Sequence, residues 1–93
     1  MRIIGDIPHS QLKITVFKMD NKLSVKFESG LYEQTYKFRV QEGLEKMQDV
    51  EKLVDPPFIS AVESILKNMH KTRMEAMRRK FTGNREDEFE EII

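Results

Sequence analysis

The chain has 93 residues, of which 39% are hydrophobic and 34% charged, a composition typical of one small soluble domain with a lean core. A chain of this length buries only about 60% of its unfolded surface, so few apolar residues remain to line a deep catalytic pocket. The sequence has 0 cysteines, which excludes disulfides, thiolate nucleophiles and cysteine-based metal sites. Its 16 basic and 16 acidic residues cancel, and this argues against general attraction to nucleic acid or to anionic membranes.

Nothing in the sequence is typical of export or of membrane insertion. The apolar patch near the N-terminus is too short for a signal peptide, and no apolar run has the length of a membrane-spanning helix. Secreted domains of this size usually carry disulfides, which this chain lacks. We therefore expect a cytoplasmic protein that does not bind membranes.

Residues 12–40 alternate between apolar and polar side chains, the pattern of half-buried strands. Asp20-Asn21 and Ser29-Gly30 interrupt this pattern and suit two-residue hairpin loops. The pattern therefore predicts a three-stranded antiparallel meander. The three isoleucines before Pro8 fit either a short fourth strand at the edge of the sheet or an apolar arm.

The two loops also predict which residues lie opposite one another, because partners across a two-residue loop have a constant sum of residue numbers. The first loop places Val16 opposite Val25, and the second places Phe27 opposite Tyr32. Both hairpins then bury the same face of the middle strand. Gln34 is a polar misfit on this apolar face, so we expect it to find a hydrogen-bond partner or to lie under a gap in the cover.

The opposite face of the meander carries basic residues that suit a nucleic-acid groove, namely Lys13, Lys26, Lys37 and Arg39. The predicted register pairs Lys13 with Glu28 and Lys26 with Glu33, and these pairs cancel much of the positive field. We interpret the face as a solvated surface, with nucleic-acid binding as the alternative.

After Val40 the apolar spacing changes to three and four residues, which predicts a helix of about three turns over 44–54. Asp55 and the two prolines after it end this helix and begin a second one, with Asp55 as the N-cap. The second helix is predicted to reach Phe81, where Thr82-Gly83-Asn84 stops it.

These elements predict a single α+β domain over residues 1–81, with both helices packed on one face of the sheet. Residues 82–93 follow as an acidic tail with five acidic residues and one basic residue, and we expect this tail to be flexible. An alternative is that its acidic residues dock on the basic end of the second helix, in this chain or in a partner.

The second helix is predicted to be longer than the sheet, because about 25 helical residues span nearly 40 Å whereas a strand of about eight spans under 30 Å. Its end therefore protrudes and carries an apolar surface, for which we predict the protein-interface residues Met69, Arg73, Met77 and Phe81. This surface predicts a non-enzymatic interaction module that forms a homodimer or binds a protein partner. The alternative for the methionines is that they fill the core.

The same half of the second helix is rich in basic residues, namely Lys67, Lys71, Arg73, Arg78, Arg79 and Lys80. One interpretation is a solvated helix face whose cations lie near the negative end of the helix dipole. The alternative function is nucleic-acid binding through phosphate contacts, with the acidic tail as a competitor.

No pattern in the sequence identifies catalytic, metal-binding or cofactor-binding residues. His9 and His70 lack a second ligand at metal-binding spacing, and none of the four glycines forms a phosphate-binding loop. We therefore expect a protein that is not an enzyme and uses no cofactor.

Residues 4–39, with the run Gly-Leu-Tyr-Glu-Gln-Thr-Tyr-Lys at 30–37, resemble the opening of a group of small uncharacterised bacterial proteins. The resemblance covers the first half of the chain. It implies a bacterial cytoplasmic origin and says nothing about activity.

Overall fold

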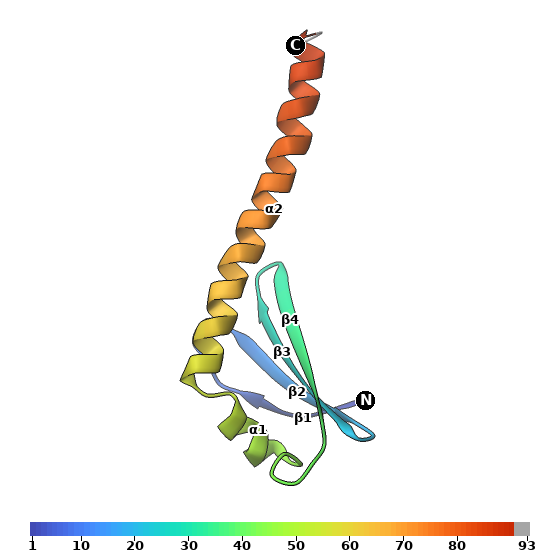
Figure 1. Ribbon diagram of the computed structural model, residues 1–93, viewed down its shortest axis with the longest axis vertical. Coiled ribbons are helices and arrows are strands. Elements are labelled where there is room, and N and C mark those ends of the chain that lie inside the picture. The colour runs from blue at the N-terminus through green and yellow to red at the C-terminus, as the bar shows by residue number, and fades with distance from the viewer. Residues whose placement is uncertain (91–93) are drawn as a thin grey trace.

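The computed structural model describes the backbone of residues 1–90 and the side chains of residues 1–82. Four antiparallel strands lie in the sheet in chain order and two helices follow (Figure 1). The predicted α+β class is confirmed, and the N-terminal isoleucines belong to a fourth strand. The elements are β1 (Arg2–Ile7), β2 (Lys13–Met19), β3 (Lys22–Ser29), β4 (Tyr32–Arg39), α1 (Met47–Leu53) and α2 (Pro56–Glu90).

The edge strand β1 pairs with β2 and is interrupted by a bulge between Ile3 and Gly5. A Cβ atom at Gly5 would lie 2.7 Å from the Sδ atom of Met47 in α1. This distance is shorter than van der Waals contact, so the absent side chain lets Met47 rest directly on the strand. The glycine thus positions α1 over the edge of the sheet.

The first hairpin confirms the predicted loop and register. Asp20-Asn21 joins β2 to β3, and Val16 lies opposite Val25. Asp20 has a φ of 54°, a left-handed conformation that Asp tolerates better than most residues.

The register predicted for the second hairpin is wrong by two residues. The loop is Gly30-Leu31, so Phe27 lies opposite Gln34 and not Tyr32. In both hairpins the first loop residue has positive φ, and Gly30 takes that position at 59°. Glycine adopts this conformation without a steric penalty, whereas Ser29 would be strained there. Moving the loop by one residue shifts the partner of each β3 residue by two positions along β4. Because side chains alternate with a period of two, the same β4 side chains still point to the apolar face.

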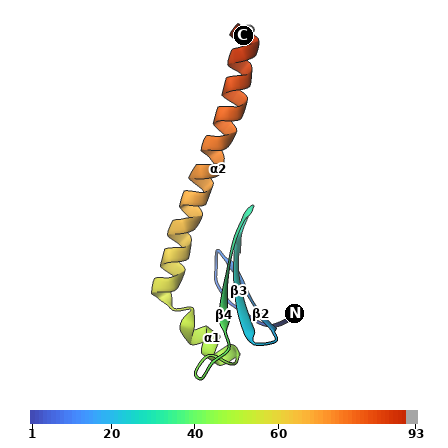
Figure 2. The same ribbon diagram turned by 45° about the vertical axis from the view of Figure 1, so that its right-hand side comes forward.

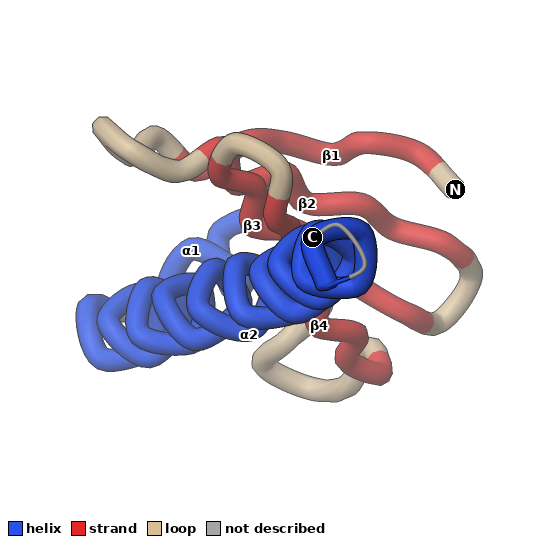
Figure 3. The backbone as a smooth tube through the Cα atoms, turned by 90° about the horizontal axis from the view of Figure 1, so that it is seen from above, coloured by secondary structure: helices blue, strands red, loops and turns tan. Residues whose placement is uncertain are grey.

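Both helices pack on one side of the sheet (Figures 2 and 3). The core lies between these layers, and its buried residues come from the two central strands, β2 and β3, from both helices and from the segments next to them. Its buried members are Leu12, Ile14, Val16, Leu23, Val25, Phe27, Val50, Val54, Val62 and Leu66. The predicted two-layer arrangement is therefore confirmed.

The first helix is shorter than the predicted range of 44–54. Leu44 pairs with Gln41 in an isolated bridge, and Gly43 has a φ of 85°, so this part of the chain forms a turn. The helix begins at Met47, where the Asp49 carboxylate accepts hydrogen bonds from the backbone N–H groups of Glu45 and Lys46 at 2.9 and 3.2 Å. Leu44 still packs against the core, which explains its apolar character.

Gln34 has the hydrogen-bond partner that its position on the apolar face requires. Its Nε2 donates to the backbone carbonyl of Val62 in α2 at 3.0 Å, and its Oε1 accepts from the Tyr36 hydroxyl. The ring of Tyr36 packs edge-on against Phe27 and Phe58. Gln34 thus joins β4 to the long helix.

The second helix begins as predicted, because the Oδ1 atom of Asp55 accepts a hydrogen bond from the backbone N–H of Phe58 at 3.0 Å. Its predicted end at Phe81 is wrong, since the helix continues to Glu90. A single glycine inside a helix costs only about 1 kcal/mol relative to alanine, so Gly83 does not by itself end a helix. The prediction of a flexible tail and of its docking concerns side chains outside the described residues.

The protrusion predicted for α2 is confirmed (Figure 1). The molecule measures 63 × 26 × 18 Å and has a radius of gyration of 18.9 Å. A compact chain of this length has a radius of about 12 Å, so the extended shape comes from the part of α2 beyond the sheet.

Candidate protein-interaction surface on the long helix

The face of α2 that covers the sheet continues along the helix after the sheet has ended. Val62 and Leu66 are buried in the core, and Met69 is the last of the described α2 residues that packs against it. A helix advances 100° per residue, so Arg73 and Met77 lie on the same line as Val62 and Leu66. The protruding half of α2 therefore presents the same side as the packed half, without a sheet beneath it.

Three large apolar side chains are exposed on this protruding half, and we call them the free stripe. Met74, Met77 and Phe81 are 43%, 37% and 49% exposed. They line a shallow hollow together with Arg78 and Thr82. Three such side chains on neighbouring turns form a continuous apolar surface, which is uncommon on the outside of a small monomeric protein.

Of the four predicted interface residues, one packs against the core, one lies beside Met74, and two belong to the free stripe. Met69 packs partly against the core, so it is a weaker interface candidate than the sequence indicates. Arg73 is half-buried and its Nη1 lies 3.7 Å from the Sδ of Met74. Met77 and Phe81 are exposed as predicted, and Met74 completes the surface. The methionines therefore serve both purposes, since Met69 fills the core and the other two do not.

A contact between Tyr32 and His70 marks the point where α2 leaves the sheet. The Tyr32 hydroxyl lies 2.7 Å from Nδ1 of His70, and the two rings pack edge-on with centroids 5.7 Å apart. Tyr32 begins β4, so this pair fixes the end of the sheet to the helix. It gives His70 a structural role at the base of the free stripe.

The six basic residues of α2 do not form one continuous face. At 100° per residue, Lys67, Lys71 and Arg78 lie together on the side of the helix next to the free stripe, and Arg78 also lines its hollow. Arg73 and Lys80 lie on the line of the core-facing side chains, and Arg79 lies between the two groups. The structure thus brings together three of the predicted nucleic-acid contacts and separates the others.

No other constellation in the described residues suggests chemistry. Among residues whose side chains are described, no three His, Cys, Asp or Glu residues lie close enough to hold a metal ion. His9 accepts backbone hydrogen bonds from Gln11 and Leu12, both at 3.1 Å, and so stabilises the turn before β2. Both histidines therefore have structural partners.

Neither described helix is long and apolar enough to cross a membrane. Comparisons with protein-family models, with curated proteins and with solved structures found no match.

Proposed function

We propose that this protein is a non-enzymatic interaction module that associates with a second copy of itself through α2. The observation that carries the proposal is the free stripe, three large exposed apolar side chains on the part of α2 beyond the sheet, of which Met77 continues the packed face and the other two lie beside it. A second α2 covering this stripe removes their surface from water, as the sheet does for Val62 and Leu66. The lack of cysteine and the resemblance to small bacterial proteins support a bacterial cytoplasmic location.

The order of charges along α2 favours an antiparallel pair. Residues 67–80 contain six basic residues and one acidic residue, whereas residues 85–91 contain five acidic residues and one basic residue. In a parallel pair like charges would face one another along the whole contact. In an antiparallel pair centred near Phe81, the acidic stretch of each helix lies beside residues 71–77 of the other, which include Lys71 and Arg73.

The proposal is tested by sedimentation equilibrium of the full chain and of two variants, Met77→Glu and Phe81→Glu. We expect a dimer for the unchanged chain and about tenfold weaker association or more for each variant, because each buries a charge where an apolar group was covered. Leu31→Glu is the matched control, since Leu31 is 78% exposed in the β3–β4 loop and is not part of the free stripe. A chain that stays monomeric at all concentrations contradicts the proposal.

The orientation is tested separately by disulfide cross-linking, which is specific because the chain has 0 cysteines of its own. In an antiparallel pair Phe81→Cys cross-links with itself, whereas two Met74→Cys side chains lie about 20 Å apart along the axis and do not. Cross-linking of both variants indicates a parallel dimer. Added salt should weaken the antiparallel pair and strengthen a parallel one.

Nucleic-acid binding by α2 is the second candidate function. It is supported by Lys67, Lys71 and Arg78, which are exposed on one side of the helix. Lys67 and Lys71 lie outside the hollow of the free stripe. Charge reversal at Lys71 and Arg78 should abolish salt-sensitive binding if this surface contacts phosphates.

A further inference from the structure

The second surface of interest is the face of the sheet that the helices leave uncovered. A hollow of about 220 Å³ lies on this face, near the loop between β2 and β3. Its lining combines apolar and basic side chains from β2, β3 and β4 with the N-terminal residue. The lining residues are Met1, Phe17, Met19, Lys22, Ser24, Lys26, Thr35 and Lys37.

The observed register arranges the charges of this face differently from the predicted one. Lys26 lies opposite Thr35 and not Glu33, and Ser24 lies opposite Lys37. Glu33 lies opposite Glu28, at the far end of the face. Glu28 and Glu33 thus gather at one end of the face, and among the lysines that line the hollow only Lys26 forms an ion pair between described side chains, with Glu28.

The basic end of the face surrounds its one aromatic side chain. Lys22 lies opposite Arg39 in the row beside the loop, and the next row contains Phe17, Ser24 and Lys37. The Nζ of Lys26 lies 5.5 Å from the centroid of the Phe17 ring and 3.7 Å from a carboxylate oxygen of Glu28. No acidic residue lines the hollow itself. The result is an apolar platform with three ammonium groups around it.

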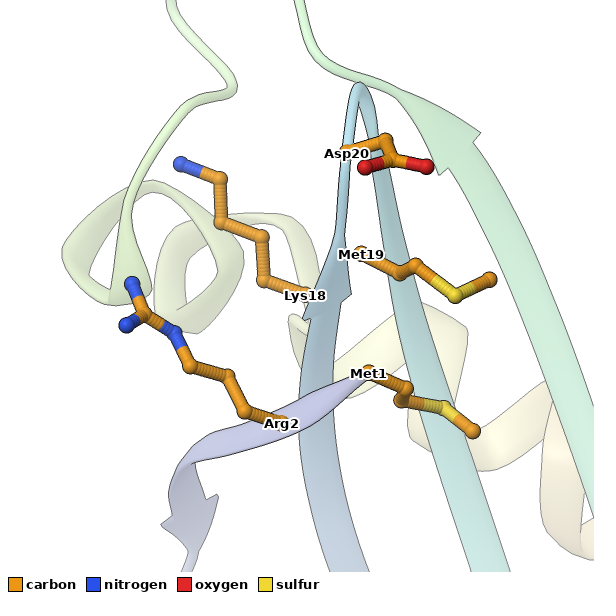
Figure 4. Close-up of a pocket in the computed structure, with 5 residues that line it drawn as sticks. All are labelled: Met1, Arg2, Lys18, Met19 and Asp20. Carbon is orange, nitrogen blue, oxygen red and sulfur yellow. The ribbon is translucent and has the colours of Figure 1, made fainter.

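Figure 4 shows how the side chains of Met1 and Arg2 lie beside the end of β2. The side chains of Met1 and Met19 extend to one side of the β1–β2 pair, whereas those of Arg2 and Lys18 extend to the other. The Nζ of Lys18 lies 3.4 Å from the carbonyl oxygen of Glu45, before α1. Met1 and Met19 therefore belong to the uncovered face and widen its apolar part.

We propose that this hollow binds single-stranded nucleic acid, with an unstacked base on Phe17 and the flanking phosphates on Lys22, Lys26 and Lys37. Proteins that bind single-stranded nucleic acid place aromatic side chains beside basic residues. The bases stack on the aromatic rings, and the phosphates of the backbone contact the basic side chains. A duplex has no free base to place on Phe17. An uncharged protein surface would remove three ammonium groups from water without compensation.

The test is fluorescence anisotropy of the full chain with labelled single-stranded DNA and RNA of about 12 nucleotides and with the matching duplex. We expect salt-sensitive binding of the single strands and weaker binding of the duplex. Phe17→Leu keeps an apolar side chain without the ring and should weaken binding about fivefold or more. Lys37→Gln should reduce the slope of log affinity against log salt by about 0.7.

Two controls make the outcome decisive. Lys52→Gln removes an exposed charge from α1, on the covered side of the sheet, and should leave single-strand binding nearly unchanged. Lys67→Gln tests the alternative surface on α2. Lys22→Gln combined with Lys37→Gln changes exposed side chains only, so it tests the site even if Phe17→Leu loses thermal stability. Absence of binding at low salt, equal binding of the duplex, or binding that depends on Lys67 and not on Lys22 and Lys37 overturns the proposal.

Discussion

At the scale of single residues, Gln34 shows how a polar side chain can hold two layers together. The amide NH₂ of Gln34 in β4 donates a hydrogen bond to the Val62 carbonyl of α2, and its amide oxygen accepts one from the Tyr36 hydroxyl. We expect Gln34→Leu to lower the free energy of unfolding by about 1–3 kcal/mol, because the Tyr36 hydroxyl then loses its partner in a partly buried site.

Urea denaturation measures this change, and Tyr36→Phe supplies the control. The variant with both substitutions should be more stable than Gln34→Leu alone, since no hydroxyl is left without a partner. A gain in stability for Gln34→Leu alone would contradict this account.

Asp49 is expected to make the free energy of unfolding depend on pH, and its lowered pKa gives the direction. Its pKa lies below the ordinary value of 3.8, first because the Glu45 backbone N–H donates to the carboxylate, and also because of the Lys46 N–H and the charges of Lys46 and Lys52. Partial desolvation opposes this shift. A lowered pKa stabilises the fold fully above pH 3.8, and the contribution is lost as the pH falls through the folded-state value.

The stability difference between the unchanged chain and Asp49→Asn should therefore be constant near neutral pH and shrink below about pH 3.8. Urea denaturation over a series of pH values measures it. Asp20→Asn is the control, because Asp20 lies in the exposed β2–β3 loop. A difference that grows toward acid would show that the carboxylate is not stabilised by these hydrogen bonds.

At the scale of elements, Asp55 determines where α2 begins. Two prolines follow it, and the Phe58 N–H is satisfied by its carboxylate. Asp55→Ala should cost about 1 kcal/mol of unfolding free energy, whereas Asp55→Ser should cost much less because serine also caps helices. Thermal or urea unfolding distinguishes them, and equal losses for both would mean that the cap contributes little.

The strands and helices differ in how well local patterns predict them. Alternation identified β2, β3 and β4, and Asp55 with its prolines located the start of α2. The predicted β3–β4 register was wrong because a loop at Ser29-Gly30 and a loop at Gly30-Leu31 would bury the same apolar face. The hydrophobic pattern therefore does not distinguish the two loops. The conformation of Gly30 decides between them.

At the scale of the whole molecule, α2 serves two purposes along its length. Its first part covers the sheet up to Met69, and the remainder protrudes. A chain that ends at Phe81 should keep its unfolding free energy within about 0.5 kcal/mol under monomeric conditions, since no described core residue is removed. The same truncation should weaken self-association, because it deletes the acidic stretch.

Urea denaturation and sedimentation of the truncated chain measure these two effects side by side. A chain that ends after Lys67 is the opposing control, because it lacks Met69 and should lose stability. Loss of the fold in the chain ending at Phe81 would show that residues beyond it belong to the domain.

The candidate sites follow the same division between local pattern and packing. Met77 and Phe81 were predicted from helical spacing, and the structure leaves them exposed. The basic platform around Phe17 was missed, because the predicted pairing of Lys26 with Glu33 concealed it. Its signal in the sequence was the position of Gly30, which sets the register of β4.

The amino-acid sequence by itself determined the α+β class, the first hairpin, the capped start of α2 and its protrusion. These features depend on the spacing of apolar residues and on the chemistry of turns and caps, which act over a few residues. Only the tertiary structure decided the β3–β4 register, the separation of Met69 from the free stripe and the charge pattern of the uncovered face. These depend on which residues meet across strands and layers, and several such arrangements satisfy the same local pattern.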